Sequence, residues 1–154
     1  MFTVPAPWTI RSDKDVHFTT ALATDALDLE TLGDAVETSS NRVPTIRSAI
    51  RRVTLISDQN LAWDVMFFRT TFVPPLTADA DLHPLVEWIE FRAVDGKRVA
   101  AAGLYLYTWT GLDIPYFTTD APGRVHVGLI NRDAVAKAAG AAGEVIIELA
   151  GVTA

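Results

Sequence analysis

The three histidines, His17, His83 and His126, are the residues that could most readily hold a catalytic metal ion. Enzymes that bind iron or related metals often combine two histidines with one carboxylate. Here the histidines are far apart in the sequence, and no H-x-H or H-x-x-x-H spacing occurs. The chain also has no cysteine, which excludes thiolate ligands, disulfides and cysteine nucleophiles. We therefore expect no metal site and no cofactor, with His83 in a loop and His126 on a sheet surface.

Aspartates are the next candidates for chemistry. Asp79 and Asp81, in TADADL, resemble a fragment of a calcium loop, but the further ligand, the glycine and the later glutamate of that motif are missing. Asp64, Asp113 and Asp120 could in principle supply the carboxylate pair of a glycosidase. Nothing in the sequence places two of them together, so we interpret them as surface or hydrogen-bonded residues.

Motifs for nucleophilic catalysis and for phosphate binding are absent from the sequence. There is no G-x-S-x-G, and no G-x-x-x-x-G-K-[ST]. The GAAG at residues 140–143 is followed by no basic residue. These patterns favour a protein that is not an enzyme.

Aromatic side chains remain as the most informative feature. They could form a platform on which sugars stack, or they could fill the core and a subunit interface, where tryptophan and tyrosine are enriched. The residues open to either role are Trp63, Trp88, Trp109, Tyr105, Tyr107 and Tyr116. We favour core and interface, and we keep the sugar platform as the alternative. The candidate interface residues are Phe2, Val4, Trp8, Tyr105, Tyr107, Trp109 and Tyr116.

The charge balance excludes some partners. The chain of 154 residues has a formal net charge of −6 at pH 7, and its basic residues are scattered, so we expect no nucleic-acid partner. The longest uncharged apolar stretch, at residues 99–112, is too short and polar to span a bilayer. Residues 1–5 lack the features of a signal peptide. We expect no membrane association and no secretion signal.

The candidate residues lie mostly in or between short segments in which apolar and polar residues alternate with a period of two. RVHVGLI, GEVIIEL, LVEWIEF and GLYLYTW all alternate in this way, and they indicate about eight strands with no βαβ rhythm. In LVEWIEF one face mixes apolar and acidic groups, which indicates a strand near a sheet edge or under a loop. In GLYLYTW the aromatic side chains share one face, which we expect to be half exposed. We predict one all-β domain over residues 1–154, an antiparallel sandwich or barrel.

Turn residues predict how these strands connect. DGK at residues 95–97 is typical of a hairpin turn, and Asp58, Gln59 and Asn60 indicate a short loop between two paired strands. Residues 70–84 read as a long surface loop because they contain Pro74 and Pro75.

Three further segments carry weaker signals. Residues 25–36 have leucines at helical spacing, and residues 133–142 predict one short helical turn or a packed loop between two strands. Residues 1–12 contain Pro5 and Pro7, which favour either an extended arm or an ordinary first strand at a sheet edge. Such an arm could add to the sheet edge of a neighbouring molecule.

Three stretches carry a family resemblance: RSAIRRVTLISDQNLAWDVMFF, GLYLYTWTGLDIPYF and VHVGLINRDAVAKAAGAAGEVIIEL. Their most distinctive pieces are S-D-x-N-L-A-W at residues 57–63, G-L-D-I-P-Y at residues 111–116 and the N-R-D run from residue 131. Over about residues 46–149 the chain resembles small accessory head proteins of tailed bacteriophages, which decorate or reinforce the capsid.

The resemblance implies a jelly-roll β sandwich and a structural role without catalysis. It also implies a homotrimer in the virion, made in the host cytoplasm, whose partners are the major capsid protein or neighbouring virion subunits. The alternative is a carbohydrate- or receptor-binding sandwich of a phage tail or fibre, which would use the aromatic face of residues 105–109.

Overall fold

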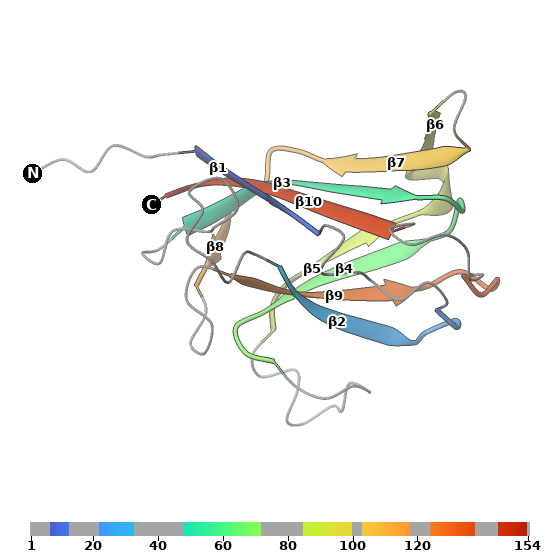
Figure 1. Cartoon of the computed structure of the whole chain (residues 1–154), viewed down its shortest axis with the longest axis horizontal. Coiled ribbons are helices and arrows are strands. Elements are labelled where there is room, and N and C mark those ends of the chain that lie inside the picture. The colour runs from blue at the N-terminus through green and yellow to red at the C-terminus, as the bar shows by residue number, and fades with distance from the viewer. Residues whose placement is uncertain are drawn as a thin grey trace, which may run out of the picture.

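The computed structural model describes residues 7–12, 22–32, 48–71, 85–99, 103–117, 124–137 and 145–153. Within these ranges the chain forms ten strands and a single 3-10 turn, Ala93–Asp95 (η1). All strand pairs are antiparallel, and the two sheets face each other as a sandwich (Figure 1). The predicted all-β antiparallel sandwich is confirmed, with more strands than the eight expected.

Six strands form the first sheet. They run in the order β1-β10-β3-β7-β6, and β8 pairs with β3 next to β7. Their bounds are Pro7–Arg11 (β1), Ser48–Ser57 (β3), Lys97–Val99 (β6), Leu104–Trp109 (β7), Ile114–Tyr116 (β8) and Val145–Thr153 (β10).

Four strands form the second sheet, in the order β2-β9-β4-β5. Their bounds are Leu27–Leu32 (β2), Trp63–Phe68 (β4), Leu85–Phe91 (β5) and Val125–Asn131 (β9). β5 is an edge strand of this sheet, as the mixed apolar and acidic face of its sequence predicts.

One hydrophobic cluster fills the space between the sheets. Alternate residues supply it because successive side chains in a strand point to opposite faces. β4 contributes Trp63, Val65 and Phe67, all fully buried. Burying each large side chain contributes about 1.5–3 kcal/mol. A smaller cluster, centred on Met66, Phe68 and Ile130, lies on the opposite face of the second sheet.

Both predicted hairpins are wrong. β3 and β4, on either side of Asp58–Asn60, lie in different sheets, and so do β5 and β6, on either side of residues 95–97. Each connection is therefore an arch that crosses from one sheet to the other. Gly96 has a φ of −73° and not the positive φ that a hairpin turn requires.

The helical interpretation of residues 25–36 is wrong where the structure describes them. Residues 27–32 form β2, which pairs with β9 along its whole length. Leu27 and Leu29 pack on the smaller cluster, whereas Leu32 is buried in the main core. Because the leucines serve both faces of the sheet, their spacing resembles that of a helix.

Two other segments are only partly described. Of residues 133–142, those up to Lys137 form bends and then a single bridge to Leu22, which fits the packed loop rather than a helical turn. Residues 7–11 are an edge strand paired with β10 of the same chain. Residues 1–6, with Phe2 and Val4, lie outside the described residues, as does the predicted loop from residue 72 to residue 84. Within the described ranges, no helix has the length and apolar character needed to cross a membrane.

Candidate binding groove at the sandwich edge

A groove runs along one edge of the sandwich, between β5 of the second sheet and β7 and β8 of the first. It consists of two adjacent hollows of about 640 Å³ and about 600 Å³. Glu90 and Trp109 border both hollows, so the two form one continuous feature that we call the edge groove. Hollows of this size are in the range of small-ligand sites in proteins.

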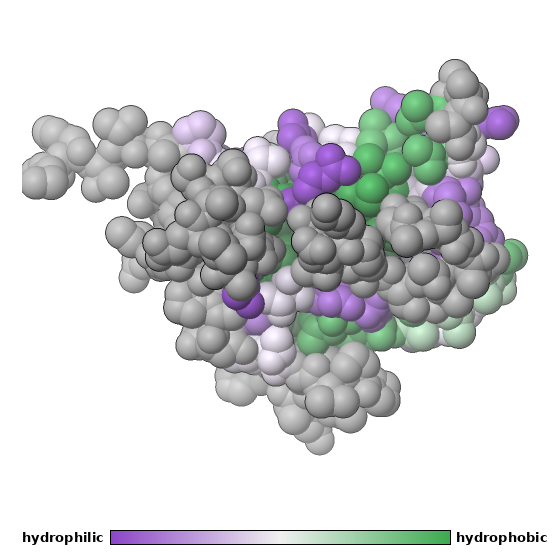
Figure 2. All heavy atoms as spheres, in the orientation of Figure 1, coloured by the Kyte–Doolittle hydropathy of each residue, from purple (hydrophilic) through white to green (hydrophobic). Residues whose placement is uncertain are grey.

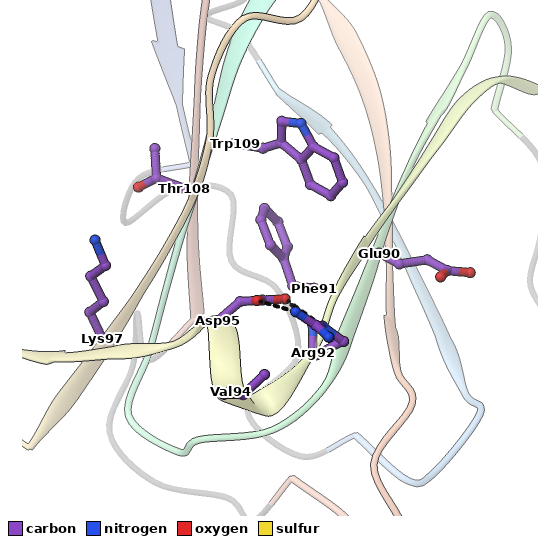
Figure 3. Close-up of a pocket in the computed structure, with 8 residues that line it drawn as sticks. All are labelled: Glu90, Phe91, Arg92, Val94, Asp95, Lys97, Thr108 and Trp109. Carbon is purple, nitrogen blue, oxygen red and sulfur yellow. Dashed lines mark hydrogen bonds and ion pairs between the residues drawn. The ribbon is translucent and has the colours of Figure 1, made fainter.

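The first hollow is built around two aromatic rings and an ion pair (Figure 3). The Phe91 ring lies between Trp109 and the pair formed by Arg92 and Asp95. The ring centroids of Phe91 and Trp109 are 6.2 Å apart, with the planes tilted by 58°. Lys97 and Thr108 complete the lining on the side of the first sheet.

The Arg92–Asp95 pair is held by several short contacts. The backbone N–H of Arg92 donates to Asp95 Oδ2 at 2.7 Å, and its guanidinium lies 3.3 Å from Asp95 Oδ1. The hydrogen bond from the backbone N–H of Arg92 makes the largest contribution to lowering the pKa of Asp95 below its ordinary value, and the bond from the Arg92 side chain adds to it. The Asp95 carboxylate therefore stays ionised at the rim of the first hollow.

The second hollow lies between Trp88 on β5 and the segment that joins β7 to β8. Glu87, Leu112 and Asp113 contribute to its lining. Trp88 and Trp109 are 42% and 46% exposed, although they come from different sheets. The Trp109 ring faces the edge groove, where it packs on Phe91, whereas Trp88 pairs with Met66 and its ring lies on the outer face of the second sheet.

Carboxylates outnumber cations in the lining of the two hollows. The carboxylates belong to Glu87, Glu90, Asp95 and Asp113, and the cations to Arg92 and Lys97. Arg51 lies outside the lining, with its guanidinium 3.6 Å from the carboxylate of the exposed Asp113. The edge groove is therefore acidic and disfavours anionic ligands.

Tyr107 and Gly96 explain why β7 and the β5–β6 arch fit together beneath the first hollow. The buried Tyr107 hydroxyl lies 2.7 Å from Asn60 Oδ1 and 2.8 Å from the carbonyl oxygen of Leu61, and it donates to these acceptors. Burial raises the pKa of Tyr107 to about 12. A Cβ on Gly96 would lie 2.6 Å from Asn60 Oδ1 and 2.8 Å from the Tyr107 ring, so only glycine fits.

The predicted interface residues separate into three groups. Tyr107, Tyr116 and Trp8 are buried in the core and leave little or no side-chain surface for a partner. Tyr105 is half buried against the core, and Trp109 is exposed in the edge groove. The aromatic face of β7 points into the sandwich, and the expectation that it is half exposed is wrong at Tyr107, which is fully buried.

The lining of the edge groove includes two acidic residues that we did not single out as site residues in the sequence. Glu87 and Glu90 both lie on β5. The signal that could have found them is the mixed face of LVEWIEF, where an apolar ring next to acids marks an exposed edge.

Two other candidate residues, His126 and Asp64, are buried and form hydrogen bonds that stabilise the fold. His126 is buried, and its Nδ1 lies 2.8 Å from Thr31 Oγ1, so the expectation of an exposed sheet residue is wrong. Asp64 is also buried and accepts a hydrogen bond from Arg132 Nε at 2.5 Å. The hydrogen bond to Asp64 is the main reason that the pKa of Arg132 is raised. A second carboxylate, that of Asp25, lies 2.9 Å from the Arg132 guanidinium.

The remaining candidates fall outside the described residues: His17, His83, Asp79, Asp81 and Asp120. Within the part of the chain that the structure describes, no three histidine, aspartate or glutamate side chains gather as they would around a metal ion.

Comparisons with protein-family models and with curated proteins found no match. No model of a protein family fits the chain, and no curated protein is significantly similar to it. The resemblance to phage head proteins therefore depends on the three sequence stretches quoted above.

Proposed function

We propose that this chain is a non-enzymatic structural protein with the jelly-roll fold, acting as an accessory protein that binds and reinforces a tailed-phage head. The observation that carries the proposal is the strand order of the two sheets. The resemblance of residues 46–149 to such head proteins points in the same direction.

The strand pairs are nested, with early strands paired to late ones. β1 pairs with β10, β2 with β9, β3 with β7 and β8, and β4 with β5. The first four strands also alternate between the two sheets. A long antiparallel ribbon that folds over on itself would produce such nested pairs, and this order supports our proposal of a jelly roll. Because folds host many functions, the wiring supports the proposal only together with the resemblance.

The polar groups of the interior support a structural role because they bond to the fold itself. Tyr116 donates from its hydroxyl to the carbonyl oxygen of Phe68 at 2.6 Å and accepts from the backbone N–H of His126 at 2.9 Å. The buried Lys137 Nζ lies 2.8 Å from Asp58 Oδ1. Each of these groups fixes one segment to another, and satisfied networks of this kind make a structure rigid.

An apolar stripe on the outer face of the first sheet supports binding to neighbouring subunits. Ile146 on β10, Ile56 on β3 and Leu106 on β7 lie opposite one another, and Leu104 faces Val99 on β6. Figure 2 shows hydrophobic residues gathered above β7, near β6, in the upper right of the view. Contiguous apolar surface of this kind marks protein interfaces. We assign the stripe to contacts with a second copy, in a homotrimer, or with the major capsid protein.

The test has two arms. The chain, added to heads of the phage whose genome encodes it, is expected to sediment with the particles, and light scattering is expected to give a trimer for the free chain. Val99→Asp places a charge on the stripe and should weaken the trimer or head binding, whereas Val135→Asp changes an equally exposed valine elsewhere and should not. A free chain that is monomeric and does not sediment with the heads would overturn the proposal.

The second candidate is a carbohydrate- or receptor-binding module of a phage tail or fibre. The specific observation that favours it is the half-exposed Trp109 ring in the edge groove. Attachment of the chain to tails instead of heads, seen by imaging the native particle, would decide for this candidate.

A further inference from the structure

We propose that the edge of β5 that faces away from β4 binds an extended segment of another protein, which adds to the second sheet as a further strand. In this segment apolar and basic side chains alternate, and the apolar ones enter the edge groove. The inference needs neither phage heads nor a trimer. It concerns an edge of the second sheet, whereas the apolar stripe lies on the first sheet.

The backbone of β5 is paired on one side only. β5 pairs with β4, and on its other side it has no neighbour among the strands that the structure describes. In an antiparallel pair, alternate residues bond to the neighbouring strand and the residues between them point away from it. The N–H of Trp88 points away, because it donates to the Glu87 carboxylate at 2.9 Å. The N–H of Arg92 likewise donates to the Asp95 carboxylate, at 2.7 Å.

Glu90 offers an open donor and an open acceptor in the middle of this edge. It lies midway between Trp88 and Arg92, so its N–H and its carbonyl oxygen also point away from β4. No residue that the structure describes bonds to its backbone on this side. The N–H of Trp88 is covered by the exposed side chain of Glu87, and charged side chains of this kind keep an open edge from pairing at random. An extended peptide adds to a sheet at such an edge.

The edge groove runs along the open backbone of β5. Its lining includes every residue from Glu87 to Arg92 in one unbroken run. Successive side chains in a strand point to opposite faces, so consecutive residues line one groove together only through their backbone. Figure 3 shows this near the end of the run, where Phe91 points toward Trp109 and Glu90 points away. The hollows therefore lie beside β5, where a further strand of the second sheet would lie.

The inner side of the edge groove fits apolar side chains. An added strand would direct every second side chain toward the first sheet, where Trp109 and Leu112 line the groove. The half-exposed Trp109 ring is held by Phe91, at 6.2 Å between ring centroids. A ring that is already ordered loses little conformational entropy on binding, so its coverage contributes more fully to affinity. We expect valine, leucine or phenylalanine at the inward positions of the segment.

The outer side of the edge selects basic side chains. Glu90 and Trp88 pair with Asp64 and Met66 of β4, and their side chains lie on the outer face of the second sheet. The residue of an added strand opposite Glu90 would place its side chain next to that carboxylate, which makes no ion pair with any described residue. Pairs of opposite charge across two strands stabilise a sheet. We expect lysine or arginine at the outward positions.

A second copy of this chain fits the edge poorly. Two β5 strands paired around a two-fold axis would bring Glu87 and Glu90 of both copies together, and like charges across strands are destabilising. The edge strand β6 is basic, but its three residues, Lys97–Val99, are too few to cover the run from Glu87 to Arg92. The charge and length of the edge therefore favour a basic segment of a different protein.

The experiment uses the full chain and an array of octapeptides. In one set lysine or arginine alternates with valine, leucine or phenylalanine. In a second set glutamate replaces the basic residues, and in a third the basic and apolar residues stand in separate blocks. We expect binding to members of the alternating basic set and none to the other two. With the best peptide bound, amide exchange followed by NMR should slow about tenfold at the Glu90 N–H, because that group gains a partner.

Two changes at Glu90 separate the contribution of the backbone from that of the charge. Glu90→Pro removes the outward N–H, and an edge strand tolerates proline where the N–H faces away from its neighbour. Glu90→Ala removes the carboxylate and keeps the N–H. By titration calorimetry, we expect Glu90→Pro to abolish detectable binding of the best peptide and Glu90→Ala to weaken it about threefold.

Trp109→Ala keeps the test open if Glu90→Pro does not fold. It removes the ring that the inward side chains would cover, and it should weaken binding about tenfold. Phe117→Ala is the matched control, because Phe117 is 44% exposed and lies outside the lining of the edge groove. This variant should bind the peptide like the natural chain.

Three results would overturn the inference. The first is no binding to any alternating basic peptide. The second is binding that leaves exchange at the Glu90 N–H unchanged, or that neither Glu90→Pro nor Trp109→Ala weakens. The third is dissociation of an oligomer of the free chain by Glu90→Pro, which would assign the edge to a second copy. Because Val99→Asp acts on the stripe, failure of the assembly proposal is read separately.

Discussion

Aromatic residues serve two purposes in this molecule, and the contrast between the core tyrosines and the half-exposed tryptophans shows both. Tyr107 and Tyr116 are buried, and each hydroxyl bonds to a named group of another segment. Trp109, in the edge groove, and Trp88, on the outer face of the second sheet, are each packed on one side and open to solvent on the other. The tyrosines stabilise the fold, whereas the tryptophans leave aromatic surface exposed to solvent.

The difference teaches that stability and binding are separable here. A change in the core should alter the free energy of unfolding, and a change in the edge groove should alter affinity with little effect on unfolding. The link between the two regions is Arg132, which pairs with the buried Asp64 and also lies over the Trp88 ring. The following predictions test this separation.

The largest effect is expected where the core has no space. A Cβ on Gly151 would lie 2.3 Å from the carbonyl oxygen of Ala49 and 2.3 Å from the Trp8 ring. Gly151→Val should therefore lower the free energy of unfolding by about 3 kcal/mol, measured by chemical denaturation. Ala150→Val, at the neighbouring half-buried position, is the control and should cost less than about 1 kcal/mol. Equal losses would show that the site is not tightly packed.

A smaller effect is expected from removing one buried hydroxyl. Tyr116→Phe leaves the N–H of His126 and the carbonyl oxygen of Phe68 without this partner in the interior. The free energy of unfolding should fall by about 2 kcal/mol. Tyr105→Phe, at a half-buried ring, should change it by less than about 0.5 kcal/mol. If both variants match the natural chain, the hydroxyl of Tyr116 does not stabilise the core.

Alkaline pH should weaken the core through Tyr107. Burial raises its pKa to about 12, so the neutral phenol is favoured in the folded chain relative to the unfolded one. This contribution is complete below the unfolded pKa of about 10 and is lost as the pH rises through 12, at a cost of about 1–2 kcal/mol. Unfolding curves at several pH values should show the decline, and Tyr107→Phe should flatten it. An unchanged slope in the variant would assign the decline to other groups.

The smallest effect on stability is expected at the link between the regions. Arg132→Gln leaves the carboxylate of Asp64, which is 4% exposed, without its guanidinium partner. Because Arg132 itself is partly exposed, we expect a loss of about 1 kcal/mol. Arg51→Gln breaks the exposed pair with Asp113 and should cost less than about 0.5 kcal/mol. A larger loss for Arg51→Gln than for Arg132→Gln would contradict the assigned roles.

The strands were predictable because alternation reports which residues face the core. It does not report which sheet a strand joins. Facing sheets lie about 10 Å apart, and a few extended residues can span that distance as easily as they can form a hairpin. The arches at residues 58–62 and 92–96 are therefore indistinguishable from hairpins in the sequence. β2 was missed because its leucines serve two faces.

The edge groove could be predicted only in part. Trp109 was identified as a candidate, but its neighbours on β7, Tyr105 and Tyr107, point into the sandwich. The strand that lines the other side of the edge groove, β5, belongs to the other sheet. No local spacing carries that information, because the contact depends on how the sheets stack.

The place of β10 in the first sheet has a consequence for the chain as it leaves the ribosome. β10 lies between β1 and β3, although it is the last of the described strands to be synthesised. Until it emerges, β1 has no neighbour in the sheet, and β3 exposes one row of backbone amides and carbonyls. Nascent chains therefore carry open sheet edges that invite association, and translation must reach residue 153 before the first sheet can close.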